Sequence, residues 1–175
     1  MSVVTARRNV ESETGKRPLT ITFLVVILGV LTIGALQGGI AMVANPTEPL
    51  GMTVEYLEGT PIDDYFLPGL FLLGIAAACV VAIAGLIFGW KWGWASRIES
   101  MVGYRWPWLA TLAIGALLLT FEDIELFAVP FHPIMHPLLI GVSLAILLLP
   151  LTPSARRYLR AESRRDDRPA SKVRS

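Results

Sequence analysis

Four apolar stretches, each close to the length of a membrane-crossing helix, set the strongest limit on what this chain can fold into. The hydrocarbon core of a bilayer is about 30 Å thick, and roughly 20 helical residues are needed to cross it. The stretches are continuous runs of Leu, Ile, Val, Ala and Gly, without the alternating pattern of a membrane β-strand. They predict an all-α membrane protein with four transmembrane helices in an up-down bundle. The predicted spans cover about residues 21–44, 65–90, 106–127 and 134–151.

All 15 Lys and Arg residues fall on one side of these predicted spans. They precede the first span, separate the second from the third, or follow the fourth, whereas the other two loops contain none. Because basic loops stay in the cytoplasm, this asymmetry predicts that both termini are cytoplasmic. The chain then divides into a polar cytoplasmic leader (1–20), a transmembrane domain (21–152) and a basic cytoplasmic tail (153–175).

Composition and motifs exclude several classes of protein. Only 17% of the residues are charged, against about 25% in a typical soluble domain. The single cysteine, Cys79, excludes an internal disulfide framework and a cysteine-rich metal site. The chain contains no phosphate-binding Gly-rich loop, no HExxH motif and no serine nucleophile elbow. The first apolar run is longer than that of a secretory signal peptide, so we expect it to remain as a span.

All five tryptophans lie within residues 90–108, which cover the loop between the second and third spans and the adjoining ends of those spans. Tryptophan is enriched where membrane helices meet lipid headgroups, so we expect this segment to anchor at the inner surface. Trp94, Ile98 and Met101 share one helical face, which predicts a short helix lying in the interface. A binding groove is the sharper alternative, but anchoring explains the same residues.

The tail that begins at Pro153 has eight basic and three acidic residues. Basic clusters next to a membrane attract anionic lipids, so the bilayer and its anionic lipids at the cytoplasmic face are expected partners. The simpler interpretation is a topology signal followed by a disordered segment. Nucleic acid is disfavoured as a partner, because Tyr158 is the only aromatic residue that accompanies these charges.

The outer loop from Asn45 to Tyr65 is the most specific part of the sequence. Thr60 as a cap, Pro61 at the first helical position and a following acid predict that the second helix begins outside the membrane, near Pro61. Pro68 would then kink that helix, unless Pro68 itself marks the helix start. The candidate interaction residues of this region are Leu50, Gly51, Met52, Leu57, Gly59, Thr60, Pro61, Asp64, Tyr65, Pro68 and Gly69.

Small residues spaced four apart allow membrane helices to approach closely. Such pairs occur in the first and second spans, although glycine is also generally common in membrane helices. The candidate helix-contact residues are Gly34, Gly38, Ala78, Ala82, Gly85 and Gly89.

One polar cluster contains residue types that can bind a metal ion or transfer a proton. It consists of three acids at the outer end of the third span and two histidines in the loop that follows. Carboxylate and imidazole together suit Zn²⁺, Mn²⁺ or iron, a proton relay, or an outward pH sensor. The simpler interpretation is that the acids mark the helix end and the histidines are solvated, with His136 at the N-cap of the fourth span. The candidate residues are Glu122, Asp123, Glu125, His132 and His136.

The outer loop resembles that of a family of small bacterial four-helix integral membrane proteins. The matching residues are Leu50-Gly51-Met52, Leu57, Gly59-Thr60-Pro61, Asp64-Tyr65 and Pro68-Gly69-Leu70. The resemblance covers this loop closely and the four-span layout loosely. It implies a multi-pass protein of the bacterial inner membrane, and it carries over no catalytic residue. The layout alone is also similar to that of DoxX-like proteins.

Three functions follow as hypotheses. The preferred one is a non-enzymatic accessory subunit that contacts a membrane-protein partner, or another copy of itself, through the outer loop. The second is a small transporter or proton or cation conduit that uses Glu122, Glu125, His132 and His136. The third is a metal-dependent membrane enzyme built on the same cluster.

Overall fold

The computed structural model is helical, and no strand occurs among the residues that it describes, which are 17–90, 93, 95–128 and 133–166. Side chains are described to Leu126 in the third long helix and to Arg160 near the C-terminus. The elements are α2 (Leu19–Ala44), η1 (Pro49–Gly51), η2 (Val54–Leu57), α3 (Phe66–Phe88), α4 (Ala95–Val102), α5 (Trp106–Ala128), α6 (Met135–Leu148), η3 (Leu149–Leu151) and α7 (Pro153–Asp166).

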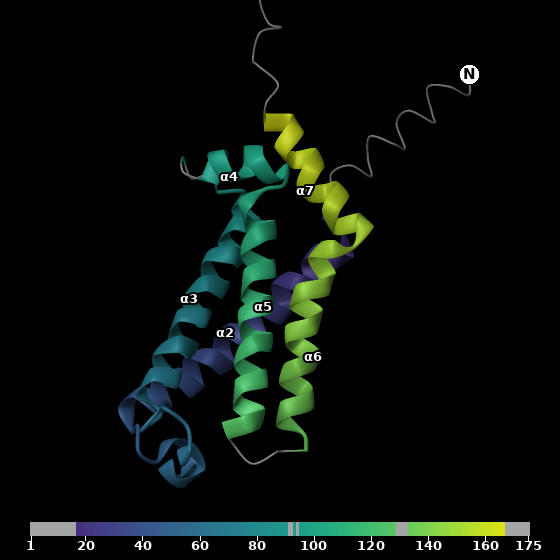
Figure 1. Cartoon of the computed structure of the whole chain (residues 1–175). Coiled ribbons are helices and arrows are strands. Elements are labelled where there is room, and N and C mark those ends of the chain that lie inside the picture. The colour runs from purple at the N-terminus through teal and green to yellow at the C-terminus, as the bar shows by residue number, and fades with distance from the viewer. Residues whose placement is uncertain (1–16, 91–92, 94, 129–132, 167–175) are drawn as a thin grey trace, which may run out of the picture.

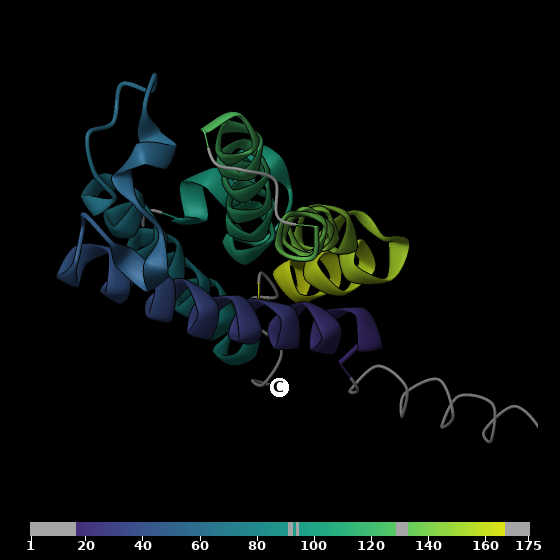
Figure 2. The same cartoon turned by 90° about the horizontal axis from the view of Figure 1, so that it is seen from below.

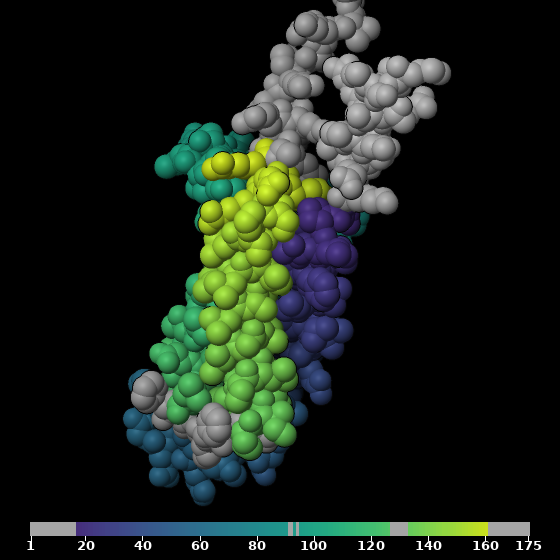
Figure 3. Space-filling view, turned by 90° about the vertical axis from the view of Figure 1, so that its right-hand side faces the viewer, coloured from purple at the N-terminus to yellow at the C-terminus, as the bar shows by residue number. Residues whose placement is uncertain are grey.

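The long helices α2, α3 and α5 and the shorter helix α6 run up and down along the molecule (Figure 1). α2 packs chiefly against α3, α5 packs chiefly against α6, and contacts between α3 and α5 join the two pairs. α2 crosses the other three at an angle, as the view from below shows (Figure 2). Its N-terminal part lies beside α6, η3 and α7, which run along one side of the molecule (Figure 3).

Within the described ranges, two helices are long and apolar enough to cross a membrane, namely α2 with 26 residues and α3 with 23. A third span is counted if the segment from Met135 to Leu151 and the start of α7 are taken as one span, bent by 55°. α5 is as long as α3, but its last two turns carry Glu122, Asp123 and Glu125. The fold therefore has the helices of a membrane protein, two of them clear candidate spans.

The interior of the bundle is as apolar as its surface. Leu24 and Leu28 of α2, Ile75 and Cys79 of α3 and Ile146 of α6 belong to one buried cluster. Large apolar side chains also cover the outside of α2, α3 and α6. A helix that is apolar all round is expected in a membrane, where lipid replaces water around it. Association of such helices relies on close packing rather than on a difference in hydrophobicity.

One close helix contact lies between Gly39 of α2 and Gly69 of α3. A Cβ atom on Gly39 would lie 2.9 Å from the carbonyl oxygen of Gly69, and one on Gly69 would lie 3.1 Å from that of Gly39. A Cβ atom on the predicted contact residue Gly38, beside this crossing, would lie 3.3 Å from Leu72, whereas one on Gly34 would have no described atom of another element within 4 Å. Sequence spacing thus identified the correct part of α2 but not the residue at the crossing.

The other predicted contact residues differ in their surroundings. Ala82 is buried and Ala78 is exposed. Gly85 lies against the ring of Trp106, and a Cβ atom there would also be 2.8 Å from Pro107. Gly89 ends α3 in the left-handed conformation, with φ at 64°. Gly85 therefore marks the contact of α3 with the start of α5.

The start of α3 differs from the sequence prediction. The helix begins at Phe66 rather than near Pro61, and Pro68 lies in its first turn, where a missing N–H breaks no helical hydrogen bond. The expected kink at Pro68 is therefore wrong, and the alternative that Pro68 marks the helix start is correct. The reason is local, because the Asp64 carboxylate accepts from the Phe66 amide at 2.9 Å. The Thr60 hydroxyl instead donates to the Leu57 carbonyl at 2.8 Å, which closes a turn.

The C-terminal tail also differs from the prediction of a disordered segment, since Pro153–Asp166 forms the helix α7. Ala155 and Leu159 of this helix are buried in the main apolar cluster. The Ser154 hydroxyl lies 2.9 Å from that of Thr20, next to the start of α2. The first part of α7 therefore belongs to the packed structure.

Aromatic side chains join α7 to the segment between α3 and α5. Trp108 donates its indole N–H to the carbonyl of Pro150 at 2.9 Å, and the Tyr104 ring stacks on Trp108 at 4.4 Å between centroids. The Arg160 guanidinium lies 4.7 Å above the Tyr104 ring. The predicted interface helix is α4, Ala95–Val102, while Trp94 lies outside the described residues.

The substitution Gly39→Ala is expected to lower the free energy of unfolding in detergent by about 1–3 kcal/mol, because the added methyl group overpacks a backbone contact. It would lie 2.8 Å from Leu73 and 2.9 Å from the Gly69 carbonyl. Gly34→Ala is the matched control, since the same helix receives the same change in open space. Thermal unfolding followed by circular dichroism compares the two. Equal stability of the variants would contradict the Gly39–Gly69 crossing.

Candidate functional site at the outer end

The outer loop folds against the ends of α2 and α3 (Figure 1). Leu57 and Tyr65 are buried together with Met42 at the end of α2. Met52, Val54, Ile62 and Leu72 pack around these three side chains. The loop therefore has a small apolar core of its own, separate from the main cluster between the long helices.

Tyr65 makes the hydrogen bonds that hold the two ends of this loop together. Its amide donates to the carbonyl of Pro46 at 2.9 Å, which joins the end of the loop to its beginning. Its hydroxyl donates to the carbonyl of Thr53 at 3.1 Å. Because the Tyr65 ring is itself buried, one residue fixes the entry, the middle and the exit of the loop.

Three residues of the loop have positive φ angles. Gly51 and Gly59 have values of 80° and 86°, which glycine adopts without strain. Leu50 has φ at 55° and ψ at 25°, a left-handed conformation that costs a leucine about 1–2 kcal/mol. Its side chain is 65% exposed, so burial does not offset this cost. The loop thus holds an apolar side chain outward in an unfavourable conformation.

The predicted interaction residues divide by exposure. Leu50, Gly51, Gly59 and Pro61 are exposed; Met52, Thr60, Asp64 and Pro68 are half-buried; Leu57, Tyr65 and Gly69 are buried. The buried ones shape the loop, and the exposed ones are available for contact. Four acids, Glu48, Glu55, Glu58 and Asp63, are exposed around them, as is the ring of Tyr56.

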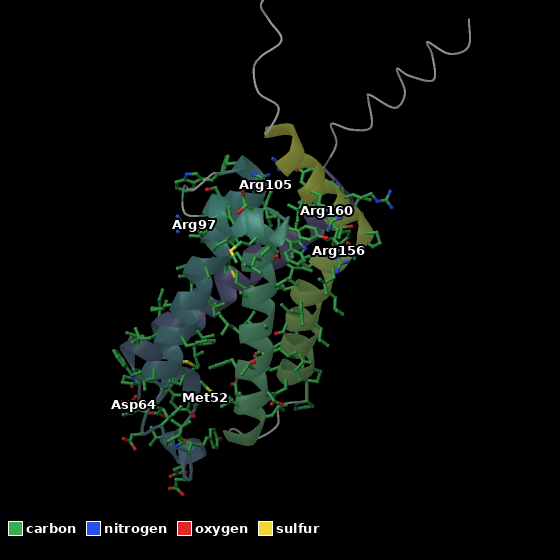
Figure 4. The ribbon with its side chains drawn as sticks, turned by 45° about the horizontal axis from the view of Figure 1, so that its top comes forward. Met52, Asp64, Arg97, Arg105, Arg156 and Arg160 are labelled. Carbon is green, nitrogen blue, oxygen red and sulfur yellow. The ribbon has the colours of Figure 1, made fainter. Side chains whose placement is uncertain are left out.

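The two ends of the molecule carry opposite charge. Figure 4 shows Asp64 and Met52 at the end formed by the outer loop, and Arg97, Arg105, Arg156 and Arg160 at the other end. The described basic residues of the sequence all lie at or near this second end, on α4, α7 and the starts of α2 and α5. This separation is the tertiary counterpart of the charge asymmetry in the sequence.

A polar cluster lies between α5 and α6, close to the outer loop. Glu122 is 2% exposed, and its Oε2 atom accepts no hydrogen bond from the residues that the structure describes. Glu125 follows one turn later and is half-buried. His136, on α6, is 5% exposed. Glu125 is close enough to both Glu122 and His136 for their charges to interact.

The structure therefore brings together three of the five residues that the sequence singled out. Asp123 is exposed and points away from the buried face of α5, and His132 lies outside the described residues. The prediction of His136 as an N-cap is wrong, because α6 begins at Met135 and its N-cap is Ile134. This places the imidazole in the first helical turn.

Tyr65 links the cluster to the loop, and sequence reasoning missed that role. Its phenol is close enough to Glu125 for the two groups to interact electrostatically. No sequence signal joins residues 60 positions apart, so this contact depends on how α3 and α5 pack. Tyr65 is thus shared between the loop and the acidic end of α5.

The described part of the cluster, which does not include His132, shows no metal-ligand set. Within the described part of the chain, no three His, Cys, Asp or Glu side chains are placed to hold a metal ion together. The positions that remain give one imidazole and two carboxylates of unequal burial. Proton transfer needs only neighbouring titratable groups and is compatible with this arrangement.

Comparison of the chain with models of protein families, with curated proteins and with solved structures finds no match.

The substitution Tyr65→Phe is expected to destabilise the outer loop by about 1 kcal/mol, since it removes one hydrogen bond and keeps the buried ring. The amide of Tyr56, which donates to Thr53 at 3.3 Å, should then exchange its hydrogen about fivefold faster. Tyr56→Phe is the control, because that ring is exposed. Hydrogen exchange read by mass spectrometry measures both, and unchanged exchange in Tyr65→Phe would contradict the proposed role of the hydroxyl.

Proposed function

We propose that this chain is a four-span protein of the bacterial inner membrane that acts as a non-enzymatic interaction subunit. Both termini lie in the cytoplasm, and α2, α3, α5 and the segment from α6 to η3 are the spans. The outer loop contacts a second membrane protein whose outward surface is basic and has an apolar pocket for Leu50. The observation that carries the proposal is the outward, strained Leu50 on a loop that is otherwise tightly packed.

The proposed topology is supported by the lengths of the helices, by their apolar surfaces and by the distribution of charge between the two ends. α5 has 23 residues, or about 34 Å of helix, enough to cross the hydrocarbon core. α6 and η3 together run from Met135 to Leu151 and are shorter, which a locally thinner bilayer or flanking polar residues accommodate. The basic residues at one end favour the cytoplasm there. The same argument places the outer loop on the opposite side.

The character of the loop surface supports a protein partner. Exposed carboxylates at Glu48, Glu55, Glu58 and Asp63 make insertion of this surface into lipid unfavourable. The same charges repel an identical loop, so a second copy facing this one is disfavoured. A basic partner gains electrostatic attraction, and the exposed Leu50 and Tyr56 offer apolar and aromatic anchors.

The strained backbone at Leu50 supports a role for this residue in binding rather than in stabilising the loop. Asparagine tolerates the left-handed region better than leucine does. A loop selected only for stability would gain from such a residue at position 50. Leucine there is explained if its side chain is buried by a partner, which would contribute about 1.5–3 kcal/mol to binding.

Topology is tested with single cysteines in a Cys79→Ser background. Glu58→Cys in the outer loop and Ser96→Cys in α4 are both at exposed positions. A membrane-impermeant maleimide is expected to label Glu58→Cys in intact spheroplasts and Ser96→Cys only after permeabilisation. The reverse pattern would invert the orientation, and labelling of both in intact spheroplasts would place the two loops on the same side.

Partner contact is tested by mild-detergent purification of a tagged copy from its own host, with bound proteins identified by mass spectrometry. Leu50→Asn is expected to keep or raise loop stability and to weaken retention of a stoichiometric partner about tenfold. Asp123→Asn, an exposed change at the same end, is the control and should retain the partner. Recovery of the chain alone, or equal retention in both variants, would contradict the proposal.

A further inference from the structure

Glu122 places an ionisable group in the interior of the bundle. Three other buried polar side chains, Thr32, Thr111 and Ser143, donate to carbonyls of their own helices at 2.7–2.8 Å. Glu122 has no such arrangement, since Oε2 accepts no hydrogen bond from the described residues. An ionised carboxylate is strongly unfavourable at a buried position where one of its oxygens accepts no hydrogen bond from the described residues.

The titratable neighbours of Glu122 come from three elements. On α5 itself, Glu125 lies one turn nearer the outer end, about 4.5 Å further along the helix axis, and Asp123 is exposed. α6 contributes His136, and the residue before α3 contributes Tyr65, both within electrostatic reach of Glu125. Glu125 is therefore the group that links Glu122 electrostatically to His136 and Tyr65.

The path inward from Glu122 is apolar. The residues one and two turns earlier on the same face of α5, Leu118 and Ile114, are each 3% exposed. Phe121 stacks on Phe71 of α3, with centroids 4.7 Å apart and ring planes at 14°. These side chains separate the cluster from the basic end of the molecule. Half-buried Glu125 lies on the other side, toward the outer surface.

We propose that Glu122 is a proton-binding site that exchanges its proton with the outer side of the membrane through Glu125 and His136. Binding a proton removes the charge that burial disfavours, and the carboxylic acid gains a donor. Two ionised carboxylates one turn apart repel each other, which further favours a proton on the more buried one. The site opens to one side only, so it senses or stores protons rather than conducting them. It rests on the proposed topology but does not depend on the proposed contact through Leu50.

Dicyclohexylcarbodiimide tests this proposal, because it enters membranes and adds to protonated carboxyl groups. The full-length protein in native membrane vesicles of known orientation is treated at neutral pH, and the adducts are located by peptide mass spectrometry. We expect the adduct on Glu122 and not on Asp123. Raising the pH on the outer side before the reagent is added should prevent most of the adduct from forming, whereas the same change on the inner side should not.

Matched variants distinguish the role of Glu122 from the roles of the neighbouring carboxyl groups. Glu122→Gln has nearly the same shape as the protonated acid, so it should fold and lose the adduct. Asp123→Asn should keep the adduct at the wild-type level. Glu125→Gln should keep the adduct but slow the loss of Glu122 reactivity after the outer pH is raised, as expected if Glu125 relays the proton.

A second measurement covers the case in which the reagent does not reach the site. Infrared spectroscopy of the reconstituted protein should show the C=O band of a protonated carboxylic acid at neutral pH, absent from Glu122→Gln. A wild-type spectrum without this band would overturn the proposal. Protection of Glu122 from the carbodiimide by Na⁺ at constant pH would also overturn it, since a sodium ion would then be the ligand.

Discussion

The hydrocarbon core of a bilayer offers no water to hydrogen-bond a backbone, and the other features of this structure depend on that constraint. The long helices satisfy their own backbone groups, and the hydroxyls of Thr32, Thr111 and Ser143 bond within the same helices. Because lipid is as apolar as the helix interior, association depends on close contact, which Gly39 and Gly69 permit. Close packing does not explain a buried ionisable group such as the carboxyl of Glu122.

The two ends of the bundle are held together in different ways. At the basic end, the Trp108 indole donates to the Pro150 carbonyl of η3, and the Tyr104 ring stacks on Trp108 of α5. The start of α7, which follows η3, packs against the core. At the acidic end, Tyr65 hydrogen-bonds to two parts of the loop and also lies near the polar cluster on α5. The acidic end is consequently where an exposed contact surface and a buried titratable group occur side by side. Both proposals use that end, through different residues.

Prediction from the sequence succeeded where one local pattern decides the outcome. An all-helical structure follows from continuous apolar runs, and the shared face of Glu122 and Glu125 follows from their spacing. It failed at the start of α3, because Thr60 closes a turn with Leu57 and the helix begins at Phe66, whose amide donates to the Asp64 carboxylate. It also failed for the tail, since burial of Ala155 and Leu159 outweighs the charge around them.

The sequence by itself determined the helical class, the separation of charge between the two ends, and the residue types available at each end. These follow from the chemistry of side chains and from helical periodicity, which act over a few turns. The tertiary structure decided which glycines meet, that His136 and Tyr65 approach Glu125, and that Glu122 is buried while Asp123 is exposed. Those outcomes depend on the rotation and crossing of helices that are apolar all round, and such helices carry no sequence pattern that specifies which face is buried.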